Sequence, residues 1–240
     1  MQYLQLKVLK DLKYEKIGLY LFFLSTFFLC SSLALGIIFL VPSLVIGTIL
    51  QSQNKYFLKD KWNIAFLLCG ALILISTILQ KSIPINNFQG LLDPNLSIIG
   101  MANWLPFFWI FWALQPYLND LHKRKVFALI LISGTLPLLI TGFGQYFFNW
   151  NGPFQIFNGL IIWYQKKIVF PGGLSGLFSN QNYAGSWLNF VWPFSIALIL
   201  DKTQNYVKRS FSIIFLFSIG ITTFLTFSRN AWAGMLIALP

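Results

Sequence analysis

The sequence contains few charged residues. Asp, Glu, Lys and Arg make up 10% of its 240 residues, whereas they make up about 25% of an ordinary soluble domain. The charges gather in short clusters, and the long runs between them hold no charged residue. Each of these runs is long enough to cross a hydrocarbon core of about 30 Å. This distribution excludes an ordinary soluble domain. It predicts an all-α polytopic membrane protein, which we expect in the inner (plasma) membrane as a multi-pass protein.

Acidic residues and metal ligands are scarcer still, with 6 acidic residues, 1 His and 2 Cys in the chain. His122 lies in a charged cluster typical of a solvated loop, whereas Cys30 and Cys69 lie inside apolar runs, where packing is expected. The sequence offers no carboxylate pair, no metal-ligand spacing and no phosphate-binding P-loop, so we expect no metal and no cofactor. The predicted spans also hold no acidic or basic residue at mid-depth, where ion-coupled transporters usually keep one.

The positive charge is in large excess, with a net charge of +11. A nucleic-acid-binding protein would gather its basic residues on one face, but here they are scattered over several clusters along the chain. We therefore expect no nucleic-acid partner. The positive-inside rule accounts for the excess, because membrane proteins retain Lys and Arg in their cytoplasmic loops.

The first apolar stretch decides the predicted orientation. Residues 17–50 would form a helix of about 51 Å, which is too long for one span, so the stretch is either one span plus an interfacial piece or a tight hairpin that turns near Ser31 and Ser32. With a hairpin and a cytoplasmic N-terminus, most basic residues fall in cytoplasmic segments, and the outer segments hold Lys81, Lys166, Lys167 and Arg229. A single span would abolish this asymmetry. The hairpin is therefore preferred.

The resulting map is one transmembrane helical domain over residues 1–240, with about seven complete transmembrane helices and a truncated eighth. The spans are predicted near 16–31, 33–50, 62–80, 98–118, 126–148, 184–200 and 211–227, and the eighth begins near Asn230. Cytoplasmic links are expected around 51–61, 119–125 and 201–210, and outer links at 81–97 and 149–183. The last apolar run is too short to cross a membrane before Pro240, so the chain is expected to be the front part of a longer protein.

The longer outer link contains a glycine- and asparagine-rich segment over residues 166–185. It begins with Lys166 and Lys167, and its glycines permit unusual backbone angles. Asn180 and Asn182 offer amide donors and acceptors just before a span. The simpler interpretation is an ordinary loop in which Asn caps a helix. The preceding residues 153–164 predict a short helix lying in the outer interface.

The second outer feature is Arg229, which lies between two apolar runs with almost no loop around it. An arginine at mid-membrane costs roughly 3 kcal/mol, so this side chain must reach the interface or find a partner. Ser218, Thr222 and Thr226 precede it at helical spacing, which predicts a polar stripe facing the bundle interior. The alternative is a span-end arginine that extends to the headgroups.

Together these features resemble the O-antigen ligase/polymerase superfamily. Residues 176–184 (GLFSNQNYA), followed by Pro193, look like one motif of that family. Residues 226–234 (TFSRNAWAG) are similar to its Ser-Arg-Gly signature at the next outer turn, roughly fifty residues later. The order, spacing and shared predicted side of the two segments make the pair more specific than either alone.

The resemblance implies a glycosyltransferase of polysaccharide biosynthesis in the cell envelope. Members move a glycan from a polyprenyl diphosphate carrier, such as undecaprenyl diphosphate, onto an acceptor at the outer face and without a metal. By resemblance, Arg229 would be the catalytic residue that holds the donor diphosphate, with Asn180 and Asn182 shaping the pocket. Lys166 and Lys167 either draw the diphosphate in or grip anionic headgroups.

Two departures from the family pattern limit the activity that we expect. Asn230 replaces the usual Gly after the arginine, and the family's large outer loop, with a second arginine and a catalytic histidine, is absent. We therefore expect a fragment that lacks full activity. Two alternatives stay open. One is a transporter of a small anion such as bicarbonate, which is the label carried by some cyanobacterial relatives. The other is a non-catalytic membrane remnant.

Overall fold

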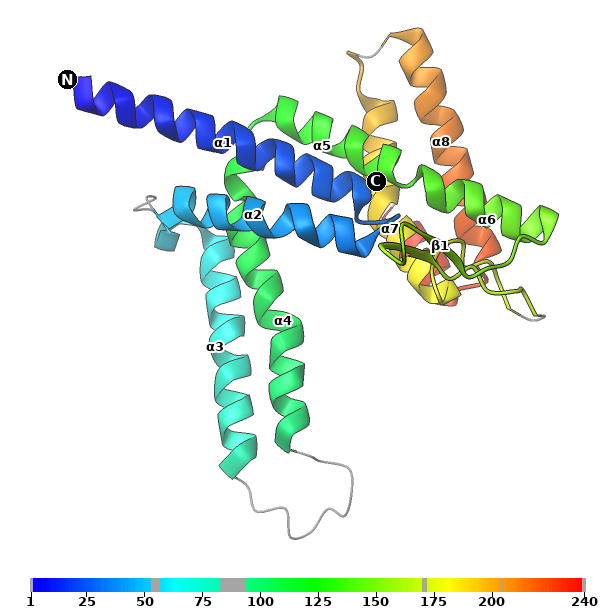
Figure 1. The fold of residues 1–240 in the computed structure, drawn as a ribbon, viewed down its shortest axis with the longest axis horizontal. Helices are drawn as coiled ribbons and strands as arrows, with labels where there is room; N and C mark the ends of the chain where they lie inside the picture. The colour runs from blue at the N-terminus through cyan, green and yellow to red at the C-terminus, as the bar shows by residue number, and fades with distance from the viewer. Residues whose placement is uncertain (1, 53–56, 83–93, 170–171, 204, 239–240) are drawn as a thin grey trace. The chain divides into compact units, whose positions relative to one another are not determined.

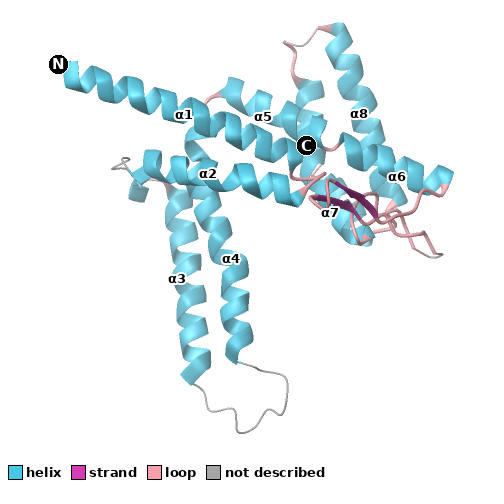
Figure 2. Cartoon of the chain, in the orientation of Figure 1, coloured by secondary structure: helices cyan, strands magenta, loops and turns pink. Residues whose placement is uncertain are grey.

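The computed structural model describes residues 2–52, 57–82, 94–169, 172–203 and 205–238 (Figure 1). Almost all of the described secondary structure is helical, and one short pair of strands accompanies the helices (Figure 2). The helices are α1 (Gln2–Phe28), α2 (Leu33–Ser52), η1 (Phe57–Lys59), α3 (Lys61–Ser82), α4 (Pro94–Leu114), η2 (Gln115–Leu118), α5 (Leu121–Gly134), α6 (Leu136–Phe148), α7 (Gln181–Leu200), α8 (Tyr206–Leu225) and α9 (Arg229–Ile237). The strands are β1 (Phe154–Ile156) and β2 (Ile161–Trp163).

Six helical segments of the described chain are long and apolar enough to cross a membrane. They are Leu33–Ser52, Lys61–Gln80, Ile98–Leu118, Leu121–Phe148, Gln181–Leu200 and Tyr206–Leu225. The chain is thus a helical membrane protein by the length and composition of its helices. The span predicted over 16–31 lies mainly within α1, which is not among the six. The count of seven spans plus an eighth and the cytoplasmic N-terminus remain predictions, and part of the outer link predicted over 81–97 lies outside the described residues.

The chain divides into two compact units, of which the first comprises Met1–Gly18 and Ser43–Tyr117. In this unit α3 packs against α4 through aromatic contacts, with the ring centroids of Phe66 and Phe108 5.3 Å apart. A chain of amides links α2 to η2 and α3: Gln51 Nε2 donates to Gln115 Oε1 at 2.9 Å, and Gln115 Nε2 donates to Asn63 Oδ1 at 3.0 Å. These polar side chains thereby satisfy one another between apolar helices, as buried amides must.

The second unit comprises Leu19–Pro42 and Leu118–Pro240. Helix α7 is central in it and packs against α5, α8 and α9. The core is formed by buried aliphatic residues from four helices, Leu131, Leu138, Leu188, Val191 and Ile219. This packing fixes both ends of α7, and each end borders a cavity described below.

The turn between the first two helices falls where the hairpin was predicted. Helix α1 ends at Phe28 and α2 begins at Leu33. The backbone N–H of Ser32 donates to the carbonyl of Phe28 at 2.7 Å, and the Ser32 hydroxyl accepts from the N–H of Leu35 at 3.3 Å. Short serine-containing turns of this kind satisfy the backbone groups left open at helix ends.

The span predicted over 126–148 is built from two helices rather than one. Pro137 occupies the first turn of α6, and because proline has no N–H, α5 cannot continue through it. Thr135 lies fully buried between the two helices, where its hydroxyl donates to the carbonyl of Leu131 at 2.9 Å and accepts from Trp187 Nε1 at 3.0 Å. Thr135 therefore joins the end of α5 to α7 at the break.

The prediction of a helix over 153–164 is wrong, because these residues form an antiparallel hairpin of β1 and β2. Phe157, Asn158 and Gly159 at its tip all have positive φ, which is incompatible with a right-handed helix and typical of a tight turn. The Trp163 indole N–H donates to the carbonyl of Ser31 at 2.8 Å, so the hairpin is anchored to the α1–α2 turn. Asn and Gly at the tip were the signal for this turn in the sequence.

Candidate functional site

The four predicted substrate-binding residues line a single cavity in the second unit. Lys166, Lys167, Asn180 and Asn182 border a space of about 310 Å³. The rest of the lining comes from α6, the loop between β2 and α7, and the first turn of α7, namely Gln145, Ile168, Val169, Gly172, Gly173, Ser175, Ser179 and Gln181. The tertiary structure thus brings together residues that the sequence places in two short segments.

Gln145 holds the wall of this cavity together. Its side chain is only 3% exposed, and its Oε1 accepts from the backbone N–H groups of Ser175 at 2.9 Å and Gly176 at 2.8 Å. Its Nε2 donates to the carbonyl of Lys166 and to the Ser175 hydroxyl, the latter at 3.2 Å. One buried amide therefore ties the lysine segment to the glycine segment. Sequence reasoning missed this residue, although it is the sole amide side chain in the span predicted over 126–148.

Gln165 fixes the backbone from which the two lysines emerge. It is fully buried, and its Nε2 donates to the carbonyls of Thr141 at 3.3 Å and Trp150 at 3.2 Å. Its own carbonyl accepts from the N–H of Gly152 at 2.8 Å. The next two residues, Lys166 and Lys167, are exposed. The buried Gln165 therefore fixes the backbone just before Lys166 and Lys167, and this keeps their positive charges at the cavity.

The charges that line the cavity are all positive. Neither the Lys166 nor the Lys167 ammonium has an ion-pair or hydrogen-bond partner within the part of the chain that the structure describes, and no acidic residue is among the lining residues. Unpaired ammonium groups attract anions, and no carboxylate among the described lining residues offsets that attraction.

The N-terminus of α7 faces the same cavity. Asn180 is the N-cap of α7, and its side chain accepts from the N–H of Asn182 at 2.7 Å. Capping is therefore one role of Asn180, as in the simpler interpretation of this loop, and both asparagines are exposed at the cavity. The first turn of a helix carries partial positive charge and favours an anion. The helix end thus adds to the attraction exerted by the lysines.

The glycine segment is docked onto the end of α8. Leu174 N–H donates to the carbonyl of Leu225 at 2.9 Å. At Gly173, a Cβ atom would collide with the backbone carbonyl of Thr226, so this close approach requires glycine. Gly173 N–H also donates to Gln181 Oε1 at the start of α7. This docking places the two motif segments, 176–184 and 226–234, next to each other.

Arg229 lies beside this region but does not line the cavity. It is the first residue of α9 and is exposed, and α9 packs closely on α7, where a Cβ on Gly185 would meet the side chains of Ala231 and Ser228. Thr222 and Thr226 are buried, as the predicted stripe requires, whereas Ser218 is half-buried. The stripe does not continue to Arg229, because α8 ends at Leu225 and a new helix starts at the arginine.

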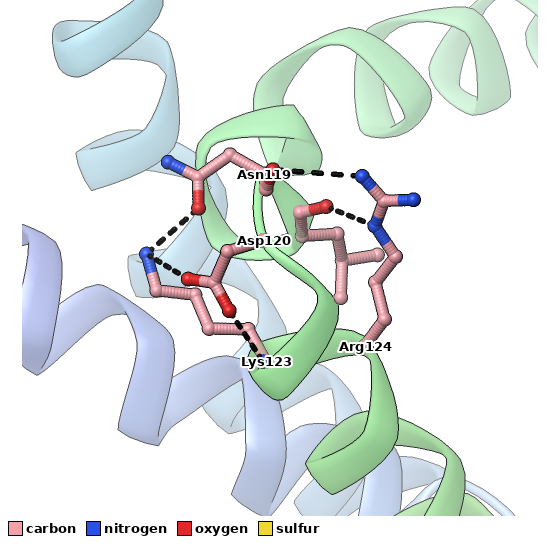
Figure 3. Close-up of polar contacts among 5 residues, drawn as sticks. Asn119, Asp120, Lys123 and Arg124 are labelled. Carbon is pink, nitrogen blue, oxygen red and sulfur yellow. Dashed lines mark hydrogen bonds and ion pairs between the residues drawn. The ribbon is translucent and has the colours of Figure 1, made fainter. Parts of the chain in front are cut away.

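The charged cluster predicted in a cytoplasmic link forms the start of α5 (Figure 3). Asp120 caps the helix by accepting from Lys123 N–H at 2.8 Å, and the two side chains form an ion pair at 3.6 Å. The Lys123 hydrogen bonds lower the pKa of Asp120. Arg124 Nε donates to the carbonyl of Leu118 at 2.9 Å. The side chains of Lys123 and Arg124 therefore bind to residues just before the helix, in the same segment of the chain.

No protein-family model, no curated protein and no solved structure matches the chain. Function must therefore be inferred from the residues of the cavity and their geometry.

Proposed function

We propose that this chain binds the diphosphate of a polyprenyl-linked glycan in the cavity formed by Lys166, Lys167 and the start of α7. The chain would act in glycan transfer at the outer face of the membrane. The observation that carries the proposal is a pair of ammonium groups, unpaired within the described residues, that share a cavity with the N-terminus of α7 and with no carboxylate among its described lining.

The chemistry of a diphosphate suits this arrangement. Its oxygens accept hydrogen bonds from ammonium groups and from N–H groups at a helix N-terminus. The cavity adjoins the first residue of a helix that is long enough to cross a membrane. A lipid-linked diphosphate lies at this depth, because its polyprenyl chain is in the hydrocarbon and its headgroup is at the surface.

In glycan transfer, the bond between the sugar and the diphosphate oxygen breaks, and the polyprenyl diphosphate leaves with an added negative charge. Fixed cations stabilise that charge as it develops. We propose that Lys166 and Lys167 hold the diphosphate and that Arg229, at the start of the neighbouring α9, reaches it with its planar guanidinium. A hydroxyl of the acceptor attacks the anomeric carbon as the bond to the diphosphate breaks, and its proton leaves to water.

The test is binding of farnesyl diphosphate, a short polyprenyl diphosphate, to the purified chain in detergent by titration calorimetry. Changing both Lys166 and Lys167 to Gln should weaken binding roughly thirtyfold, for a loss of ~1 kcal/mol per cation. The matched control changes Lys202 and Arg209 to Gln. It removes the same charge from exposed positions outside the cavity and should bind like the wild type.

Equal loss in both double variants would show only a general charge effect and would overturn the proposal. If bicarbonate displaces bound farnesyl diphosphate as effectively as inorganic diphosphate does, the result would instead favour transport of a small anion. Binding tests the site without requiring turnover, so the result does not depend on whether the chain is catalytically complete.

The proposed outer position of the cavity has a separate test. Cysteine placed at Asn158, in the exposed hairpin tip, should react with a membrane-impermeant thiol reagent in intact cells, whereas cysteine at His122 should not. Both native residues are exposed, so accessibility within the fold is matched. The exposed Cys69 is first replaced by Ser, and the buried Cys30 is retained. Labelling at position 122 alone would reverse the predicted topology.

A further inference from the structure

A second and larger cavity lies at the opposite end of α7. It has a volume of about 590 Å³ and is bordered by α5, the end of α7 and the start of α8. The first cavity contacts Gln181 and the second contacts Leu198 and Asp201. Because a helix rises 1.5 Å per residue, the positions of α7 that line the two cavities lie about 20 to 30 Å apart, most of the thickness of a hydrocarbon core. The two cavities therefore border opposite leaflets.

The part of the second cavity away from its charged residues is mostly apolar. Leu129 and Ile132 of α5, Leu198 of α7, and Phe211 and Phe215 of α8 line it, together with a few serines. Leu129 is 48% exposed and Phe211 is 62% exposed. Large apolar side chains exposed on membrane-spanning helices face lipid, so this wall is open to the acyl chains of the bilayer.

The rim of the cavity is polar and carries an ion pair. Lys125 Nζ lies 2.8 Å from Asp201 Oδ2 and donates to the Thr203 hydroxyl at 3.3 Å. Asp201 also accepts from the N–H of Thr203 at 3.0 Å and from its hydroxyl at 2.8 Å. These bonds tie the start of α5 to the α7–α8 turn. They leave the single carboxylate of the lining fully engaged by its neighbours.

Two further nitrogen groups on the rim are available. Lys208 is exposed in the first turn of α8, and His122 is exposed in the first turn of α5. Within the described chain, neither the Lys208 ammonium nor the His122 ring has a hydrogen-bond or ion-pair partner. With Asp201 paired with Lys125, the polar part of the lining keeps the positive charge of Lys208, and the same cavity is lined by apolar side chains.

We infer that this cavity binds one anionic phospholipid, with its phosphate at Lys208 and His122 and an acyl chain along the apolar wall between α5 and α8. A soluble anion would use the rim but not the apolar wall, and a neutral lipid would use the wall but not the unpaired ammonium. Basic pockets between transmembrane helices bind anionic headgroups for this reason. The inference is independent of the diphosphate site, which lies at the other end of α7.

The test is native mass spectrometry of the full chain in detergent, titrated with phosphatidylglycerol, phosphatidylcholine or soluble glycerol 1-phosphate. Phosphatidylglycerol should bind first and about fivefold more tightly than phosphatidylcholine, the preference expected for one basic residue near the headgroup. Lys208→Gln should remove that preference. Arg209→Gln is the matched control, since Arg209 is a neighbouring exposed residue outside the cavity lining, and it should keep the preference.

A second variant tests the acyl-chain part without changing charge. Ser133 is an exposed lining residue, so Ser133→Trp should fill the apolar wall and weaken both phospholipids about equally. Ile140→Trp, at an exposed position on α6 outside the cavity, should leave both unchanged. Three outcomes would each overturn the inference. They are equal effects of Lys208→Gln and Arg209→Gln on the lipid preference, unaltered lipid binding in Ser133→Trp, and displacement of the bound lipid by glycerol 1-phosphate.

Discussion

Replacing Gln145 with Leu is expected to loosen the wall of the diphosphate cavity. Leu has a similar size but cannot accept the N–H bonds of Ser175 and Gly176, which Gln145 Oε1 accepts at 2.9 and 2.8 Å. Both N–H groups are buried. The substitution also removes the donor to the carbonyl of Lys166. The lysine and glycine segments then lose the side chain that joins them.

The magnitude follows from the two buried N–H groups that lose their acceptor. Each unsatisfied buried donor costs about 1–3 kcal/mol. The adjoining cavity lets solvent offset part of this cost, so the lower end of the range, ~2 kcal/mol in total, is the appropriate value. For a chain of this size, 1 kcal/mol lowers Tm by about 2–4 °C, which gives an expected fall of roughly 4–8 °C.

The assay compares the Tm of Gln145→Leu with that of Gln155→Leu in the same detergent, by the change in tryptophan fluorescence on heating. Gln155 is exposed on β1, so the same chemical change there should alter stability by no more than about 0.5 kcal/mol. Farnesyl diphosphate binding should weaken in Gln145→Leu and not in Gln155→Leu. An equal Tm in the two variants would refute the assigned role of Gln145.

Three further predictions concern the surroundings of the two cavities. Arg229→Lys should weaken farnesyl diphosphate binding about tenfold at unchanged Tm, because an ammonium lacks the planar fork of a guanidinium; undiminished binding would leave Arg229 as a span-end residue that reaches the headgroups. Gly173→Ala should lower Tm by several degrees, since its Cβ would collide with a carbonyl at the end of α8, whereas Gly100→Ala, which meets nothing within 4 Å, should not lower it. Hydrogen bonds from Lys125 and Thr203 lower the pKa of Asp201 to about 2. Because its unfolded value is about 4, the stabilisation is complete above that pH and is lost as pH falls towards 2. The Tm difference between wild type and Asp201→Asn should therefore shrink over that range, and a constant difference would contradict the assignment.

The helical, membrane-spanning character of this chain could be predicted from its sequence because it depends on local composition. Long uncharged runs between charged clusters indicate membrane spans, and this signal does not depend on how the helices pack against one another. The turn at Ser31 and Ser32 and the start of the last helix near Asn230 were likewise predictable, since polar residues interrupt apolar runs there. The lysines and asparagines of the first cavity were also selected in advance, because such residues stand out in an apolar chain, whereas Gln145 was not.

Only the tertiary structure decided how these pieces combine. The break at Thr135 and the β-hairpin over 153–164 depend on backbone geometry that apolar periodicity does not reveal. The role of Gln145 depends on contacts with residues 21 to 31 positions away. The docking of Gly173 on the end of α8 and the separation of Arg229 from the stripe that precedes it also depend on distant segments. Sequence determined which side chains stand out from an apolar background, and tertiary packing determined which of them share a cavity, because that depends on where distant helices end and meet.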